Sequence, residues 1–127
     1  MVHEILKIKS VHSTVGYSHA AKAGNTLYIA GQVAKDVDDN LVGKGDCEAQ
    51  CNQAFENLKS ILAEAGGTLQ NIVKMTTFLT DYSYIEAFRN VRSKYLPEPC
   101  PPNTLLIIDS LALPEFMVEI EAIAVLD

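Results

Sequence analysis

Long apolar runs and secretory signals are both missing from this 127-residue sequence. No stretch of eighteen consecutive apolar residues occurs, so the chain is not expected to cross a membrane. The first ten residues, MVHEILKIKS, lack the basic region and apolar core of a secretory signal. We therefore expect a cytoplasmic location and no membrane partner.

Basic residues are few. Ten Lys and Arg stand against sixteen Asp and Glu, which gives a formal net charge of −6. Proteins bind nucleic-acid backbones through clustered basic residues that displace counterions. The densest cluster here is the KIK of residues 7–9. Nucleic acid is therefore not expected as a general partner, although a local basic patch is left open.

Residues for metal or nucleophile chemistry are sparse. The three cysteines are an odd number, which does not favour a disulfide framework. Cys47 and Cys51 would share one helix face, but a metal site would need two more ligands, and no His or other Cys lies near them in sequence. HxxxH, HExxH, GxSxG and glycine-rich phosphate motifs are absent. We expect no metal and no cofactor.

The residues that are present predict a single domain over residues 1–127, with 48% hydrophobic and 20% charged residues. Hydrophobic periodicity predicts strands at 26–34, 72–80, 104–109 and 116–126, with a hairpin partner at 41–43. An amphipathic helix is expected at 46–65, between the N-cap Asp46 and a glycine pair, Gly66 and Gly67. A second helix is expected to begin with a Ser83–Glu86 capping box and to end at Pro97.

This order of elements predicts an α+β fold in which two helices pack on one face of a sheet. The chain is too short to supply a third layer for the other face. Because the strands are apolar on both faces in places, we expect self-association to cover it.

The last strand places two carboxylates on one face. Alternation directs Glu119 and Glu121 to the same side, roughly 7 Å apart, beside aliphatic residues. Mutual repulsion and lost hydration would raise the pKa of one of them and suit it to proton transfer near neutral pH. The alternative is a wet face on which both carboxylates are simply solvated.

Four stretches in order, GNTLYIAGQV, AFENLKSILAEAG, IVKMTTFLTD and MVEIEAIAV, resemble the YjgF/YER057c/UK114 family, also called the Rid family. The resemblance extends from about Gly16 to Val125. It implies a chorismate-mutase-like α+β fold of mixed sheet, and a homotrimer with a central barrel and intersubunit clefts. It also implies hydrolysis of reactive enamines and imines to 2-keto acids and ammonia. Some members of the family were named translation inhibitors or endoribonucleases.

The resemblance also implies site residues. Glu119 matches the family glutamate that holds or activates the hydrolytic water, and Gly31 matches a glycine that lines the cleft, followed by Gln32. Ser18 stands at the position of a cleft tyrosine, with Tyr17 one place earlier. Arg89 stands at the position of a cleft asparagine.

One position departs from the family pattern. Imine deaminases carry an arginine in a PARS-like motif, whose guanidinium clamps the substrate carboxylate. This sequence reads PPNT, so that Asn103 replaces the arginine and Thr104 follows it. Loss of such a contact costs a few kcal/mol, about two to three decades in binding.

Two arginines are candidates for a substitute anchor. Arg89 and Arg92 would project from the second helix, although the alternative for both is a solvated helix face. The hypotheses are therefore a hydrolase of an imine, enamine or related small molecule, a non-catalytic trimer that binds a small metabolite, and an RNA-processing protein.

Overall fold

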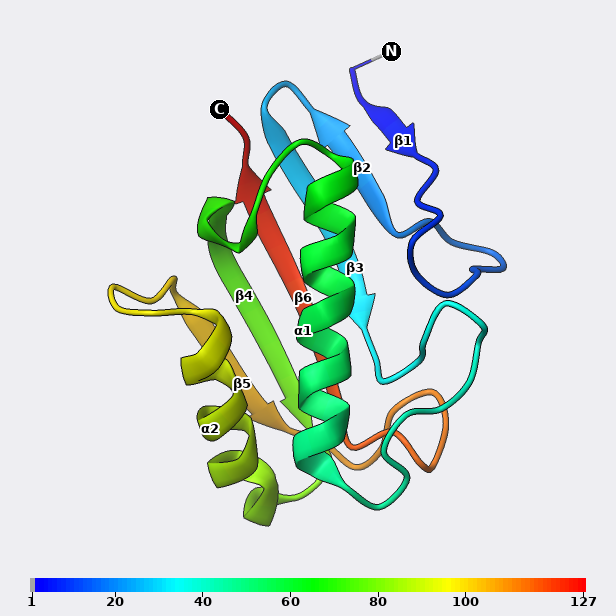
Figure 1. Ribbon diagram of the computed structural model, residues 1–127, viewed down its shortest axis with the longest axis vertical. Helices are drawn as coiled ribbons and strands as arrows, with labels where there is room; N and C mark the ends of the chain where they lie inside the picture. Colours follow the sequence, from blue (N-terminus) through cyan, green and yellow to red (C-terminus); the bar gives the residue numbers. More distant parts are fainter. Residues whose placement is uncertain (1) are drawn as a thin grey trace.

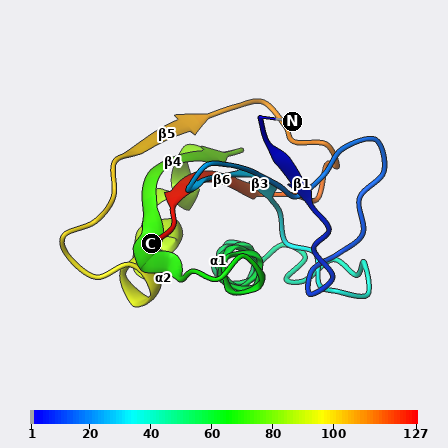
Figure 2. The same cartoon turned by 90° about the horizontal axis from the view of Figure 1, so that it is seen from above.

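Two helices cover one face of a six-stranded sheet, as the computed structural model of the chain shows for residues 2–127 (Figures 1 and 2). The helices are α1, Cys47–Glu64, and α2, Ile85–Tyr95. Two short 3-10 turns, Leu69–Asn71 and Tyr82–Tyr84, precede β4 and α2. The strands are β1 Glu4–Leu6, β2 Ala20–Ala23, β3 Thr26–Gln32, β4 Ile72–Leu79, β5 Asn103–Ile107 and β6 Val118–Val125.

The sheet is mixed, with the strand order β1-β2-β3-β6-β4-β5. Among the strands within residues 2–127, only β4 and β5 pair in parallel. Helix α2 lies in the connection between them, as a parallel crossover requires. The last strand, β6, lies in the centre of the sheet between β3 and β4. The expected α+β architecture, with both helices on one face, is confirmed.

Alternation along β6 separates the core from the open face of the sheet, which we define as the face turned away from α1 and α2. Val118, Ile120, Ala122 and Ala124 are buried on the helix side. Glu119, Glu121, Ile123 and Val125 alternate with them and point the other way, as the sequence predicts.

The first helix follows its sequence signals closely. Asp46 caps it, with the carboxylate accepting a hydrogen bond from the amide of Ala49 at 3.1 Å. Gly66, at φ +89°, takes the left-handed conformation that ends the helix, and the amide of Gly67 donates back to Leu62. Phe55, on the buried stripe, stacks on both Phe88 and Tyr95 of α2.

Two local expectations differ from the structure, and two short strands were not predicted. The Ser83–Glu86 capping box is wrong, because Asp81 instead accepts hydrogen bonds from the amide and hydroxyl of Ser83. The hairpin partner at 41–43 is reduced to a single bridge between Lys35 and Leu41. The short strands β1 and β2 were not predicted, since three and four residues are too few to show a period.

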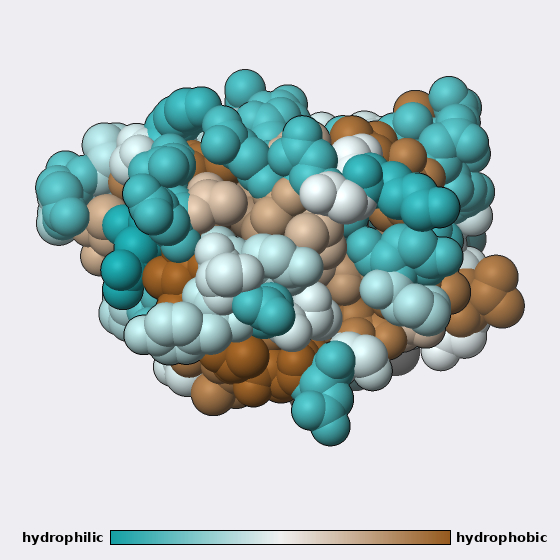
Figure 3. Space-filling view, turned by 90° about the horizontal axis from the view of Figure 1, so that it is seen from below, coloured by the Kyte–Doolittle hydropathy of each residue, from teal (hydrophilic) through white to brown (hydrophobic). Residues whose placement is uncertain are grey.

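The open face is partly apolar, as the sequence predicts. Figure 3 views the molecule from below, and hydrophobic residues gather along its lower edge, on the side away from the helices. Large exposed side chains of this face include Ile5, Tyr28, Leu106 and Val125. None of the helices within residues 2–127 is long and apolar enough to cross a membrane.

The cap of α1 gives a stability prediction. Asp46→Ala removes the acceptor for the Ala49 amide and should lower the free energy of unfolding by about 1 kcal/mol. Urea titrations at one fixed protein concentration measure this difference. Asp38→Ala, at an exposed position in the loop after β3, is the control and should change stability by less than about 0.5 kcal/mol. Equal effects of the two substitutions would contradict a capping role.

Candidate functional site

A bulge in β3 lies beside the carboxylates of β6. The pairing of β3 with β6 shifts between Ile29, opposite Ala122, and Gln32, opposite Ile120. Ala30 and Gly31 therefore both stand across from Glu121. Such a two-against-one arrangement bends the strand and redirects its neighbouring side chains, and bulges are frequent next to functional sites.

Glu119 lies directly against Gly31. An ideal Cβ placed on Gly31 would be 2.6 Å from Cδ of the Glu119 side chain, so no larger residue fits without displacing the carboxylate. Glu119 is half-buried, whereas Glu121 is exposed. Burial raises the pKa of the Glu119 carboxyl, and the nearby charge of Glu121 raises it further. The direction of this shift agrees with the hypothesis that one of the two carboxyls has a raised pKa, and the group concerned is Glu119.

Tyr17 and Ser18 lie near the same end of the open face. Tyr17 is 53% exposed, and its ring approaches the His19 ring edge-on, with centroids 6.2 Å apart. Burial, followed by the charges of Glu119 and Asp39, raises the pKa of the Tyr17 phenol. Ser18 is exposed and lines a hollow on the sheet with His19. Tyr17, Ser18, Gly31 and Glu119 are therefore gathered in one region of a single chain.

Gln32 lies in the protein interior beneath this region. It is fully buried, and its amide nitrogen donates to the Ala30 carbonyl and to Nδ1 of His19, both at 3.0 Å. Nε2 of His19 donates to the carbonyl of His12 at 2.7 Å, which makes Nδ1 the acceptor for Gln32. These bonds hold the bulge and the start of β2 together. Sequence analysis missed this long-range network, because no local spacing links His12, His19 and Gln32.

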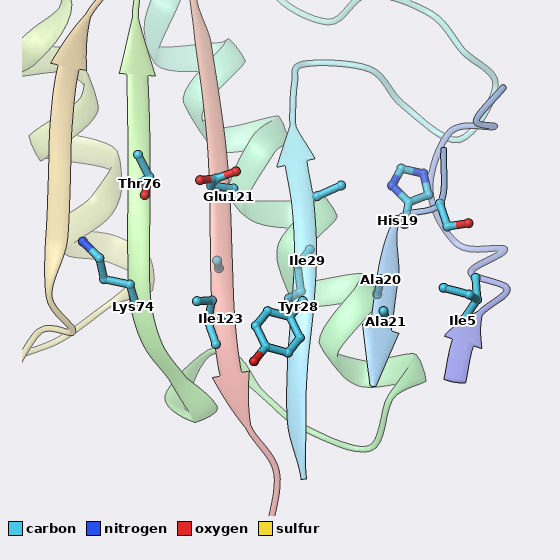
Figure 4. Close-up of a pocket in the computed structure, with 13 residues that line it drawn as sticks. Ile5, His19, Ala20, Ala21, Tyr28, Ile29, Lys74, Thr76, Glu121 and Ile123 are labelled. Carbon is cyan, nitrogen blue, oxygen red and sulfur yellow. The ribbon is translucent and has the colours of Figure 1, made fainter. Parts of the chain in front are cut away.

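The hollow on the open face has a volume of about 480 Å³ (Figure 4). Its charged residues are Lys74 and Glu121, with Thr76 between them. Nζ of Lys74 donates to Oγ1 of Thr104 at 2.8 Å. Sequence analysis overlooked Lys74 and Thr76, although alternation within the predicted strand 72–80 places both on one face. The apolar walls include Ile5, Ala21, Tyr28 and Ile123.

Asn103 and Thr104 point to opposite faces of the sheet. Thr104 pairs with Thr76 and shares the open face with Lys74. Asn103 pairs with Met75 on the helix side, where its Oδ1 accepts a hydrogen bond from the buried Thr77 hydroxyl at 3.0 Å. Within one chain, Asn103 is therefore not brought to Glu119.

Arg89 and Arg92 are also apart from Glu119, since α2 lies on the other side of the sheet (Figure 2). Arg89 is exposed. Arg92 is half-buried, and its Nε has no hydrogen-bond partner among residues 2–127. Either arginine could meet Glu119 only across a boundary between two copies of the chain.

The cysteines and histidines form no larger cluster. The sulfur atoms of Cys47 and Cys51 lie 3.8 Å apart inside the core as free thiols. Over the described range 2–127, no group of three or more His, Cys, Asp or Glu is arranged to hold a metal ion. The chemistry in reach of the site is proton transfer by the half-buried Glu119.

Known proteins resemble this chain over nearly its whole length. The sequence profile of the family described as Endoribonuclease L-PSP matches residues 7–126. A RutC family protein of Pyrococcus abyssi is 34% identical, covering 98% of each chain. The 3-aminoacrylate deaminase RutC of Acinetobacter baylyi is 32% identical over 85% of each.

A solved structure agrees with this relationship. The crystal structure of RidA from the Antarctic bacterium Psychrobacter sp. superposes with a TM-score of 0.87 at 36% identity, covering 96% of this chain and 98% of that one. The matches in sequence and in structure both extend through the strands that carry Gly31 and Glu119. The chain belongs to the Endoribonuclease L-PSP family, which is the YjgF/YER057c/UK114 or Rid family that its sequence resembles.

Proposed function

We propose that the protein hydrolyses a reactive enamine, imine or related small metabolite, with Glu119 as the catalytic residue. The observation that carries this proposal is the half-buried carboxyl of Glu119, whose pKa burial raises. A carboxyl of this kind exchanges protons nearer to neutral pH than an exposed one does. The relative that is named a 3-aminoacrylate deaminase supports the same reaction class.

The reaction needs only water and a proton carrier. Glu119 takes a proton from water as the water oxygen bonds to the iminium carbon. The proton then passes to the nitrogen of the resulting carbinolamine. The C–N bond breaks, the hydroxyl oxygen becomes the carbonyl of the product, and nitrogen leaves as ammonium with the hydroxyl proton. Tyr17, Ser18 and the Gly31 backbone would hold the polar atoms of the substrate.

The remaining site residues require a second copy of the chain. Strand β5 carries Asn103 and Thr104, and helix α2 carries Arg89 and Arg92. Within one chain these four residues lie away from Glu119. We infer a homotrimer with a central barrel, in which these residues line a cleft against Glu119 of a neighbouring subunit. The exposed apolar residues of the open face support this assembly, because a monomer would leave them in water.

Asn103 separates this chain from the usual 2-imino acid deaminases. Its amide cannot form the two-pronged, charge-assisted contact that an arginine makes with a carboxylate. The substrate therefore lacks a carboxylate or binds it through another cation. The second candidate function is a non-catalytic trimer that binds a metabolite in the same cleft, and Asn103 is the observation that favours it. An endoribonuclease is a third candidate, for which the net charge of −6 gives no support.

Turnover distinguishes the hydrolase from the binding trimer. If another cation takes the place of the missing arginine, we expect the protein to accelerate keto-acid release from 2-iminobutanoate made in place from threonine by a dehydratase. We expect Glu119→Gln to slow this release at least a hundredfold, because a positioned proton carrier contributes about 10²–10⁴ in rate. Glu86→Gln, at an exposed glutamate of α2, is the control and should leave the rate unchanged. No acceleration at high protein concentration would eliminate the usual deaminase reaction, and an unaffected Glu119→Gln would remove Glu119 from the mechanism.

The raised pKa of Glu119 also predicts a pH-dependent stability. Because the folded pKa exceeds the unfolded one, its stabilising contribution is complete below the unfolded pKa, about 4.3, and is lost as pH rises through the folded pKa. Glu119→Gln has no such loss, so its stability relative to the parent should rise as the pH increases above the unfolded pKa of about 4.3. Urea unfolding at several pH values measures the difference. A difference between Glu119→Gln and the parent that stays constant with pH would contradict the raised pKa.

A charge introduced on the open face tests whether the chain forms the proposed homotrimer. Light scattering should give a mass of three 13.9 kDa chains for the parent. Leu106→Glu should dissociate the assembly, because Leu106 lies on the open face of β5 and is 44% exposed in the single chain. Leu113→Glu changes an equally exposed leucine in the loop before β6 and should leave the mass unchanged. A monomeric parent at micromolar concentration would refute the homotrimer.

A further inference from the structure

One buried side chain joins two parts of the proposed site. It is that of His19, which directly precedes β2 (Figure 4). One part of the site is the bulge of β3, which packs Gly31 against Glu119. The other part is the loop of residues 13–18, which carries Tyr17. His19 forms hydrogen bonds on both sides, and these bonds determine how the two parts are held.

Ala30, the first residue of the bulge, is held by both of its backbone polar groups. Its amide donates to the carbonyl of His19 at 2.8 Å. Its carbonyl accepts from the side-chain nitrogen of Gln32 at 3.0 Å, and the same nitrogen donates to Nδ1 of His19 at 3.0 Å. Three hydrogen bonds therefore close a ring through these residues. Gly31 directly follows the residue that the ring fixes.

The orientation of the Gln32 amide depends on the His19 ring. The amide oxygen, Oε1, is buried and has no hydrogen-bond partner among residues 2–127. Both amide hydrogens have acceptors only while Nδ1 of His19 carries a lone pair. If Nδ1 carried a proton, the amide would have to turn its oxygen toward the ring, and the Ala30 carbonyl would lose its donor.

The other ring nitrogen of His19 secures the loop. Nε2 donates to the carbonyl of His12 at 2.7 Å, and this bond joins the two ends of the loop 13–18. A carbonyl oxygen only accepts, so Nε2 carries the proton and Nδ1 is free to accept. The rings of His12 and His19 also pack edge-on, with centroids 4.7 Å apart. The backbone thus selects the tautomer that the Gln32 amide requires.

We propose that His19 is a positioning residue for Glu119, and that it acts as the neutral tautomer protonated on Nε2. In this form one imidazole holds the bulge through Gln32 and the loop through His12. The effect of His19 on turnover rests on the proposed hydrolysis. Its effect on the ionisation of Glu119 does not, because that ionisation is measured without a substrate.

The first test determines the tautomer in the parent protein. Long-range proton–nitrogen NMR distinguishes a protonated ring nitrogen from one that accepts a hydrogen bond. We expect a protonated Nε2, an unprotonated Nδ1, and a scalar coupling from Nδ1 of His19 to the side-chain nitrogen of Gln32. This measurement needs no substitution, so it holds even if a variant fails to fold. A His19 ring protonated on Nδ1 at neutral pH would overturn the proposal.

The second test separates the two bonds of the ring with a pair of amide side chains. The oxygen of Asn reaches about as far as Nδ1 of His, and the nitrogen of Gln about as far as Nε2. His19→Asn therefore keeps an acceptor for Gln32, whereas His19→Gln keeps the donor to His12. In carbon-13 NMR titrations, the midpoint of Glu119 should stay raised in His19→Asn and fall toward about 4.3 in His19→Gln. Equal midpoints in the two variants would overturn the proposal, because a packing role alone would not distinguish two amides.

Turnover links this role to the proposed function. His19→Gln should slow keto-acid release at least tenfold, since misplacing a catalytic group by about 1 Å costs up to 10²-fold. His19→Asn should slow it less, and His3→Gln, at an exposed histidine before β1, should change neither the rate nor the Glu119 midpoint. Unchanged turnover in His19→Gln would overturn the proposal. A protein without turnover that shows the expected difference in midpoints would refute the hydrolase and support the positioning of Glu119 by His19.

Discussion

The contact between the Glu119 carboxylate and the backbone of Gly31 is the constraint on which the site depends. A Cβ at position 31 would overlap the carboxylate, so any larger residue there would displace Glu119 from its present place. The bulge at Ala30 and Gly31 places that glycine opposite β6, and the Gln32 side chain holds the bulge through the Ala30 carbonyl. Packed in this way, Glu119 loses part of its hydration, and its pKa rises.

The central strand serves the fold and the site at once. Its even-numbered residues from Val118 to Ala124 fill the core beneath α1. Its odd-numbered residues place Glu119 and Glu121 on the open face, beside the apolar Ile123. A surface that combines carboxylates with exposed apolar side chains is poorly suited to bulk water. The same surface suits a cleft or hollow that a metabolite or a neighbouring subunit covers.

Much of the fold could be predicted from periodicity, since α1 and the strands β4 and β6 are long enough to show a clear pattern. The site was less predictable, because the register between paired strands determines which side chains lie next to one another. The sequence treats Asn103 and Thr104 as one polar pair, yet pleating sends them to opposite faces. The contact of Lys74 with Thr104 is visible only once the pairing of the strands is known. The hydrogen-bond network of His12, His19 and Gln32 joins segments that are distant in sequence, so no local sequence pattern predicts it.

The ionisation of Glu119 in the folded protein is the most direct test of this account. Carbon-13 NMR of the glutamate side-chain carboxyls, assigned with Glu119→Gln, follows this titration residue by residue. We predict a midpoint for Glu119 above the ordinary glutamate value of about 4.3, and a decrease of the Glu119 midpoint when Glu121→Gln removes the neighbouring charge. A Glu119 midpoint at the ordinary glutamate value of about 4.3 would contradict the account, because the Gly31 contact would then not desolvate the carboxylate.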